Sequence, residues 1–239
     1  MPEDLFRFKQ FNINQIGATL KVCTDSCLFG AWIAQNYKGL KVLDIGTGTG
    51  LLALMYAQNN PESHILALEI DTESATLSKN NFMQSPWSQR LESKCISLQD
   101  FVKEYKDSRF DLLFCNPPFF ENQLPSKKHQ HNLAKHSACL TKTELIFSFT
   151  QLLSENGTVC VLLPPYEATT FAEMAKDAGF HLKENVTIRN KTGQAAFRHI
   201  LCFGKKEGTL ILSELTIYQS DKIYSPEFQA LLNNYYLAL

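Results

Sequence analysis

The sequence predicts a doubly wound α/β domain, whose mostly parallel, seven-stranded sheet carries an antiparallel edge strand. Short apolar runs alternate five times with longer helical stretches from about Leu40 onward, as expected of repeated strand–helix units. Two late strand candidates follow one another with no helix between them, and such neighbours pair antiparallel. We therefore expect residues 36–239 to form the domain, and residues 1–35 to form an N-terminal extension packing over the mouth of the sheet.

The first half of the domain shows the alternation most clearly. Residues 41–45 form an apolar run typical of a buried strand, and residues 51–58 follow the glycines as a helix. Residues 64–70 predict the second strand. Thr72 is suited to cap the helix that comes next, because its hydroxyl can accept a hydrogen bond from a free backbone N–H. Residues 95–96 mark a third, weaker strand.

The second half begins at a fourth strand, 110–115, which two prolines stop because proline cannot donate to a sheet ladder. Thr141 and Glu144 have the spacing of a capping box, so a helix is expected to begin there. The remaining predicted elements are a strand at 158–163, a helix to 178, strands near 182–189 and 197–203, an extended segment at 209–218 and a short helix opening at 225–227.

The bulk properties exclude several classes of protein. The 239 residues carry a net charge of −1, so overall basicity cannot hold this chain on nucleic acid. Seven cysteines are scattered without a Cys-x-x-Cys pair, which favours neither a zinc site nor a disulfide framework. No signal peptide or membrane-spanning run is evident. We expect a cytoplasmic protein that needs no metal and contacts no membrane.

A glycine-rich run follows the first strand, Asp44 preceding Gly46, Gly48 and Gly50. Glycines at a strand–helix junction let a ligand approach backbone N–H groups that a side chain would block. Glu69, at the end of the second strand, is placed to accept hydrogen bonds from ribose hydroxyls. This spacing alone allows two adenosine cofactors, a nicotinamide dinucleotide and S-adenosylmethionine.

Two acidic residues favour S-adenosylmethionine. Asp44 stands directly before the glycines, where its carboxylate would repel a pyrophosphate but could pair with the ammonium group of a methionine moiety. Asp100, after the third strand, could accept a hydrogen bond from an adenine amino group.

The tetrapeptide Asn116, Pro117, Pro118 and Phe119 follows the fourth strand, which the expected topology places beside the glycine loop. The Asn116 side-chain carbonyl and the Pro117 backbone carbonyl could bind the hydrogens of a planar amino group and favour a pyramidal nitrogen. Prolines stiffen the loop, and Phe119 offers a face on which a base can stack. These residue types predict methylation of a conjugated amino nitrogen.

On the run at 44–50, Glu69 and the run at 116–119, the chain resembles the class I S-adenosylmethionine-dependent methyltransferases, which have a Rossmann-like fold. The segment 6–32 narrows this resemblance to bacterial methyltransferases that modify N6 of the adenine 3′ of the anticodon in valine tRNA. It implies that Thr24 and Asp25 lie near the methionine end of the cofactor. Cys23 departs from the glycine of the family's Lys-Val-Gly-Thr-Asp pattern.

Basic residues gather after the Asn-Pro-Pro-Phe run, where Lys127, Lys128 and Lys135 could contact phosphates flanking a target base in tRNA. Arg198 could add to such a surface from a later strand. A solvated loop without a ligand is the alternative interpretation of these charges.

Other functions share parts of this pattern. The Asn-Pro-Pro-aromatic run also suits guanine N2 in ribosomal RNA or a glutamine amide in protein, because all three acceptors present a conjugated nitrogen. An RNA-binding module without catalysis would be expected to have damaged motifs, whereas Asn116, Pro117 and the glycines are intact. A dehydrogenase leaves the run at 116–119 unexplained.

Overall fold

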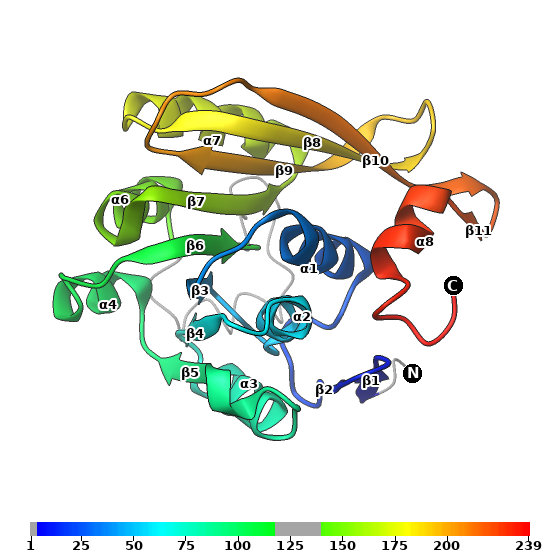
Figure 1. Cartoon of the computed structure of the whole chain (residues 1–239), viewed down its shortest axis with the longest axis horizontal. Helices are drawn as coiled ribbons and strands as arrows, with labels where there is room; N and C mark the ends of the chain where they lie inside the picture. The colour runs from blue at the N-terminus through cyan, green and yellow to red at the C-terminus, as the bar shows by residue number, and fades with distance from the viewer. Residues whose placement is uncertain (1–3, 118–139) are drawn as a thin grey trace, which may run out of the picture.

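The computed structural model describes residues 4–117 and 140–239, and nine strands within those ranges form one sheet. The strand order across it is β11-β10-β8-β9-β7-β6-β3-β4-β5 (Figure 1). In chain order the strands are β3 (Lys41–Ile45), β4 (His64–Glu69), β5 (Leu91–Cys95), β6 (Phe110–Cys115), β7 (Leu153–Leu163), β8 (His181–Lys191), β9 (Ala196–Gly204), β10 (Ile211–Ser220) and β11 (Ile223–Tyr224).

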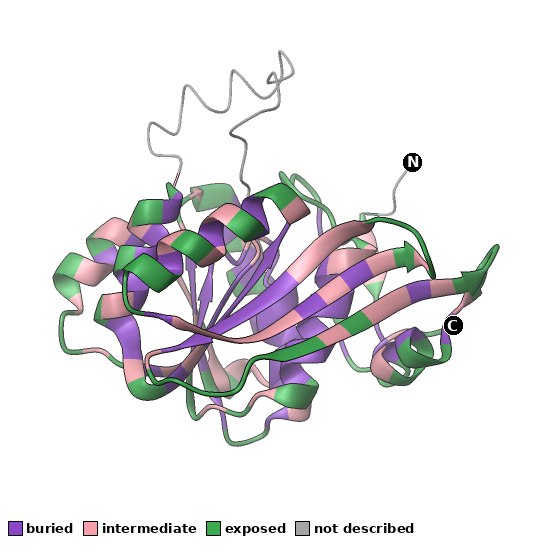
Figure 2. Cartoon of the chain, turned by 90° about the horizontal axis from the view of Figure 1, so that it is seen from above, coloured by how far each residue is buried: buried purple, intermediate pink, exposed green. Residues whose placement is uncertain are grey.

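Helices cover both faces of this sheet, as Figure 2 shows from above. On one face lie α1 (Thr24–Asn36), α2 (Leu51–Asn59), α3 (Thr72–Met83) and α8 (Pro226–Leu232), and on the other lie α4 (Leu98–Glu104), α6 (Lys142–Leu152) and α7 (Pro165–Asp177). Successive residues of a strand point to opposite faces, so Val42 joins the first core and Leu43 the second. The expected doubly wound α/β class is confirmed.

The sheet differs from the sequence prediction in two respects. It has nine strands in the described ranges rather than seven, because residues 209–218, expected only to be extended, form most of β10, and β11 pairs with it. The short edge strand β11 is antiparallel, as an antiparallel edge predicts, whereas the second antiparallel strand, β9, lies inside the sheet between β7 and β8. Through α7 the chain crosses from β7 to β8, which lies two positions away in the sheet. Strand β9 then turns back from β8 and occupies the position between them.

Local signals account for most element ends. Thr141 and Glu144 form the predicted capping box at the start of α6. The helix after β4 is capped by Asp71 rather than by Thr72, since the Asp71 carboxylate accepts from the Ser74 N–H. Helix α4 was not anticipated, although Ser97 caps it by accepting from the Asp100 N–H.

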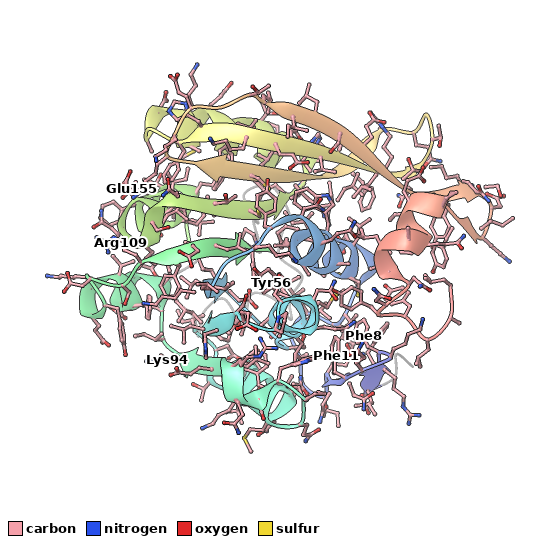
Figure 3. The ribbon with its side chains drawn as sticks, in the orientation of Figure 1. Phe8, Phe11, Tyr56, Lys94, Arg109 and Glu155 are labelled. Atoms are coloured by element: carbon pink, nitrogen blue, oxygen red, sulfur yellow. The ribbon has the colours of Figure 1, made fainter. Side chains whose placement is uncertain are left out.

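The N-terminal residues form a small hairpin of β1 (Leu5–Arg7) and β2 (Asn12–Asn14). Phe8 and Phe11 stack with their ring centroids 4.5 Å apart, and Figure 3 shows both beside α2 and the hairpin. Phe11 also meets the edge of Trp87, so the hairpin is anchored by buried aromatic area. Packing of residues 1–35 over the mouth of the sheet stays a prediction.

Helix α1 packs closely on α2 within the core. A Cβ atom at Gly30 would lie 2.8 Å from the Met55 sulfur, so glycine is needed for this approach. Tyr56 of α2, labelled in Figure 3, is buried in the same core, and its hydroxyl donates toward the Tyr37 carbonyl. None of the helices in the described ranges is both long and apolar enough to cross a membrane.

Candidate active site

The candidate site lies where β3 and β6 end side by side. Ile45 pairs with Cys115, so Gly46 and Asn116 leave adjacent positions on the carboxyl edge of the sheet. The chain continues from β3 to β4 on one side, whereas β6 and β7 lie on the other. A reversal of strand order of this kind opens a crevice at the ends of the strands, which is where doubly wound sheets bind ligands.

The glycine loop needs its glycines for backbone conformation. Gly46, Gly48 and Gly50 have φ of 71°, 55° and 85°, in the left-handed region. A Cβ at Gly46 or Gly48 would meet no atom within 4 Å, so the described residues leave open space beside both. A Cβ at Gly50 would come within 2.5 Å of Phe82, so this last glycine brings α2 close to α3.

Asp44 is completely buried at the end of β3. The Thr47 hydroxyl donates to Asp44 Oδ2 over 2.6 Å, whereas Oδ1 accepts no hydrogen bond of normal geometry among the described residues. Burial raises the pKa of Asp44 to about 7, and the Glu69 carboxylate adds a smaller increase. Hydrogen bonds from Thr47 and the Ala53 backbone lower this pKa in part. A cationic partner would relieve the cost of the buried charge.

Glu69 braces the glycine loop from the end of β4. Its Oε2 accepts from the Gly48 N–H at 2.9 Å, and its Oε1 accepts from the Asp71 N–H at 3.0 Å. A carboxylate has about four lone-pair sites, so two of them are still available to a ligand's hydroxyl groups. Asp71, two residues after Glu69, uses its carboxylate to cap α3.

Asn116 is oriented by the start of α1. Its Nδ2 donates to Ser26 Oγ at 3.0 Å, and Ser26 Oγ in turn contacts Cys23 Sγ at 3.0 Å. Because the amide nitrogen faces Ser26, the carbonyl oxygen faces the other way, where it accepts from no residue that the structure describes. Asn116 is half-buried, and a carbonyl oxygen at this position can bind an amino hydrogen.

Asp25 and Arg198, assigned separately to cofactor and RNA on sequence grounds, form an ion pair. Arg198 Nε lies 2.9 Å from Asp25 Oδ2, and the Ser26 N–H donates to Oδ1. Thr24, the first residue of α1, precedes this pair. The pair therefore links β9 to α1, the helix that orients Asn116. It also occupies the Arg198 guanidinium, which the predicted contact with an RNA phosphate would need.

Asp100 lies in the first turn of α4, beyond the end of β5. Its carboxylate contacts Lys103 Nζ at 2.9 Å and Ser97 Oγ at 2.7 Å. These hydrogen bonds, with that from Lys103 the larger, hold the pKa of Asp100 below its usual range. An adenine amino group would have to share an acceptor that is already used.

Several predicted residues cannot be placed. Pro117 directly follows Asn116 and is half-buried, whereas Pro118 and Phe119 lie outside the described residues. The lysines predicted to contact RNA, Lys127, Lys128 and Lys135, also lie outside them.

Sequence reasoning missed three supporting side chains. Thr47 and Ser26 stood inside the recognised runs, but only their contacts with Asp44 and Asn116 reveal what they do. Asn81 gave no signal on its helix, yet its Nδ2 donates to the carbonyls of Thr49 and Asn14 and its Oδ1 accepts from the Asn14 N–H. It thereby fastens β2 to the glycine loop.

The part of the chain that the structure describes contains no group of three or more His, Cys, Asp or Glu side chains that could hold a metal ion.

Known proteins are similar in sequence to this chain over almost its whole length. A profile of the family described as "Methyltransferase small domain" matches residues 23–151, just over half of the chain. A Dyadobacter fermentans protein named tRNA1(Val) (adenine(37)-N6)-methyltransferase is 38% identical, over 97% of this chain and 97% of its own. A Photorhabdus laumondii protein of the same name is 37% identical, over 98% of this chain and 96% of its own.

Solved structures share the fold. A predicted O-methyltransferase of Agrobacterium tumefaciens superposes with a TM-score of 0.68 at 15% identity, covering 88% of this chain and 96% of its own. A 16S rRNA N2 G1207 methyltransferase of T. thermophilus, solved with AdoMet and guanosine, has a TM-score of 0.55 at 15% identity. It covers 84% of this chain and 50% of its own.

Proposed function

This chain belongs to the methyltransferase small domain family and, within it, to the relatives named tRNA1(Val) (adenine(37)-N6)-methyltransferase; from that premise we propose that it methylates N6 of an adenine in valine tRNA. The methyl donor in this proposal is S-adenosylmethionine, and the adenine is the one numbered 37 in the names of the relatives. A tRNA substrate would place the protein in the cytoplasm.

The observation that carries this proposal is the orientation of Asn116 at the switch point. Its amide nitrogen is held by Ser26, so its carbonyl oxygen is presented beside the glycine loop. An exocyclic amino group is a poor nucleophile because its lone pair is delocalised into the ring. Hydrogen bonds to fixed carbonyl oxygens of Asn116 and Pro117 would favour a pyramidal nitrogen and stabilise the positive charge that develops on it.

The residues around the glycine loop fit S-adenosylmethionine on physical grounds. Asp44 has a buried oxygen without a normal hydrogen bond, which suits the ligand's ammonium group, and open space adjoins Gly46 and Gly48. Glu69 has acceptor capacity for ribose hydroxyls while it braces the loop. When bound, this cofactor supplies an electrophilic methyl group on a sulfonium.

The other predicted residues take supporting positions in this proposal. Thr24 and Asp25 would lie toward the methionine end, with Gly50 setting the start of α2 behind the loop. Asp100 would receive the adenine amino group of the cofactor. Pro118 and Phe119 would complete the substrate loop, with Phe119 stacking on the target base.

The test uses two transcripts of valine tRNA that differ only in having adenine or guanine at position 37. The protein is incubated with each transcript and with S-adenosylmethionine carrying a deuterated methyl group, and methylated nucleosides are quantified by mass spectrometry. We expect N6-methyladenosine from the adenine transcript and no transfer to the guanine transcript. Equal transfer to both, or label in methylguanosine alone, would reject the adenine assignment.

A further inference from the structure

A second polar hollow lies on the same edge of the sheet as Asn116. It has a volume of about 290 Å³ and is lined by Lys191, Tyr218, Lys222 and Tyr224. Tyr218 pairs with Lys191 across β10 and β8 and with Tyr224 across β10 and β11, so two lysines and two tyrosines converge where these strands end. In Figure 1 this region is the β10–β11 turn beside α8.

The tyrosines form part of an aromatic ladder. Tyr218 and Tyr224 stack with ring centroids 5.0 Å apart and an interplanar angle of 17°, and Tyr224 stacks on the buried Phe228 at 4.6 Å. Tyr218 is half-buried and ends the ladder, since it meets no further aromatic ring within the described ranges. Such an end ring, held by its neighbours, is a platform on which a flat base can stack.

The lysines are held by the turn that follows β10. Lys222 has φ of 62° and is the one residue other than glycine with positive φ among those described. That conformation is disfavoured for a long side chain and marks a constrained turn. Lys222 is exposed and has no carboxylate partner among the described residues, whereas Lys191 is paired with the exposed Asp221. One lysine is thus available to an anion, and the other becomes available if Asp221 is displaced.

The hollow lies at a distance from Asn116 that suits one continuous RNA. Four steps separate β6 from β10 in the sheet, and a spacing of about 4.8 Å per step gives roughly 19 Å across the strands. The strand registers place Asn116 level with Ser213, so Tyr218 lies a further roughly 16 Å along the strand direction, and the two sites are roughly 25 Å apart. A stacked nucleic acid strand advances about 3.4 Å per nucleotide, so this distance corresponds to roughly seven nucleotides.

We propose that Lys191, Lys222, Tyr218 and Tyr224 form a second RNA-contact surface, which binds the substrate's phosphate backbone and stacks one unpaired base away from the methylated adenine. The inference rests on the proposed function for its substrate. Lys222 and Lys191 neutralise phosphates, and Tyr218 supplies the stacking face. Asp221 opposes binding, because a phosphate must compete with its carboxylate for Lys191.

The charge contribution is tested by binding of fluorescein-labelled valine tRNA, measured by fluorescence anisotropy between 50 and 200 mM KCl. A variant combining Lys191→Ala with Lys222→Ala is compared with a control combining Lys41→Ala with Lys106→Ala. The control removes the same charge from the opposite edge of the sheet, near Arg109 at the far side of Figure 3 from β11. Each lost phosphate contact lowers the slope of log affinity against log salt by about 0.7–0.9.

The expected result follows from that slope. Over a fourfold rise in salt, two contacts correspond to a roughly tenfold loss of affinity, so the wild type and the control should lose about tenfold more than the Lys191/Lys222 variant. Asp221→Asn should bind more tightly than wild type. Tyr218→Leu should bind at least about fivefold more weakly, whereas Tyr218→Phe should keep wild-type affinity because it keeps the stacking face.

Two outcomes would overturn the inference, and they are distinguishable. If wild type binds and methylates tRNA while the Lys191/Lys222 variant keeps the same affinity and salt slope, the second surface is wrong and the proposed function stands. If wild type does not bind tRNA, both fail. Urea unfolding of Tyr218→Leu checks that its effect is not loss of fold, and unchanged affinity in a folded Tyr218→Leu variant would reject the stacking role.

Discussion

The buried carboxylate of Asp44 makes folding stability depend on pH, and Asp44→Asn isolates its contribution. Burial raises the pKa of this carboxyl from 3.8 to about 7. A shift of about three pKa units corresponds to about 4 kcal/mol, at 1.36 kcal/mol for each unit. Asparagine keeps a carbonyl oxygen to accept the Thr47 hydroxyl but cannot ionise, so the substitution removes the charge with little change in shape.

The direction in which stability changes with pH follows from the raised pKa of Asp44. Between pH 3.8 and about 7 the folded chain retains a proton that the unfolded chain releases, so stability is fully present below pH 3.8 and is lost as the pH rises through about 7. From pH 5.5 to pH 8 the wild type should lose about 2 kcal/mol through Asp44. The stability of Asp44→Asn relative to wild type should therefore rise by about that amount over the same interval.

The assay is urea unfolding of the ligand-free protein at pH 5.5, 6.5, 7.5 and 8, with Asp107→Asn as an exposed carboxylate control. A free-energy difference between Asp44→Asn and wild type that stays constant with pH would refute the reasoning. Calorimetry then measures how the affinity for S-adenosylmethionine depends on pH. Wild-type affinity for S-adenosylmethionine should increase as the pH rises through 7, because the ionised carboxylate pairs with the ammonium group, and Asp44→Asn should bind weakly without this increase.

Three further substitutions test separate parts of the site. Asn116→Ala should lower kcat by about 100-fold or more while S-adenosylmethionine affinity, measured by calorimetry, stays within about twofold; an equal loss of binding would make Asn116 structural. Ser26→Ala should lower kcat about fivefold, the effect of one lost hydrogen bond, with Ser26→Thr restoring it; unchanged kcat would exclude orientation by Ser26. Gly50→Ala should lower the free energy of unfolding in urea by about 1–3 kcal/mol, because Phe82 occupies the space that a Cβ would need. Gly193→Ala is the control, since Gly193 has a similar positive φ but a Cβ there would meet no atom within 4 Å, and it should destabilise the fold less. Equal losses for the two variants would refute the contact with Phe82.

Local signals made much of the fold predictable. The capping box at Thr141, the prolines after β6 and the glycines after β3 each act over a few residues, so the sequence shows them directly. Strand order at the carboxyl edge followed from the doubly wound class. The insertion of β9 between β7 and β8 did not, because pairing of distant strands depends on packing of the whole sheet rather than on any short run.

The sequence likewise predicted the main residues of the candidate site but not the contacts that orient them. Asp44, Glu69 and Asn116 stand at strand ends, where the topology brings them to one edge. The hydrogen bond from Asn116 to Ser26 and the ion pair of Asp25 with Arg198 join residues 90 and 173 positions apart, and no local pattern encodes them. Side-chain partners at such separations follow only from the folded arrangement.

The central claim is that the carbonyl of Asn116 directs methyl transfer to an adenine amino nitrogen. The most direct measurement digests tRNA to nucleosides after incubation of wild type and Asn116→Ala with methyl-labelled S-adenosylmethionine and tRNA from a strain lacking the enzyme. We predict label in N6-methyladenosine with wild type and at least about 100-fold slower labelling with Asn116→Ala. Label in another nucleoside or in protein, or equal rates for the two proteins, would contradict the claim.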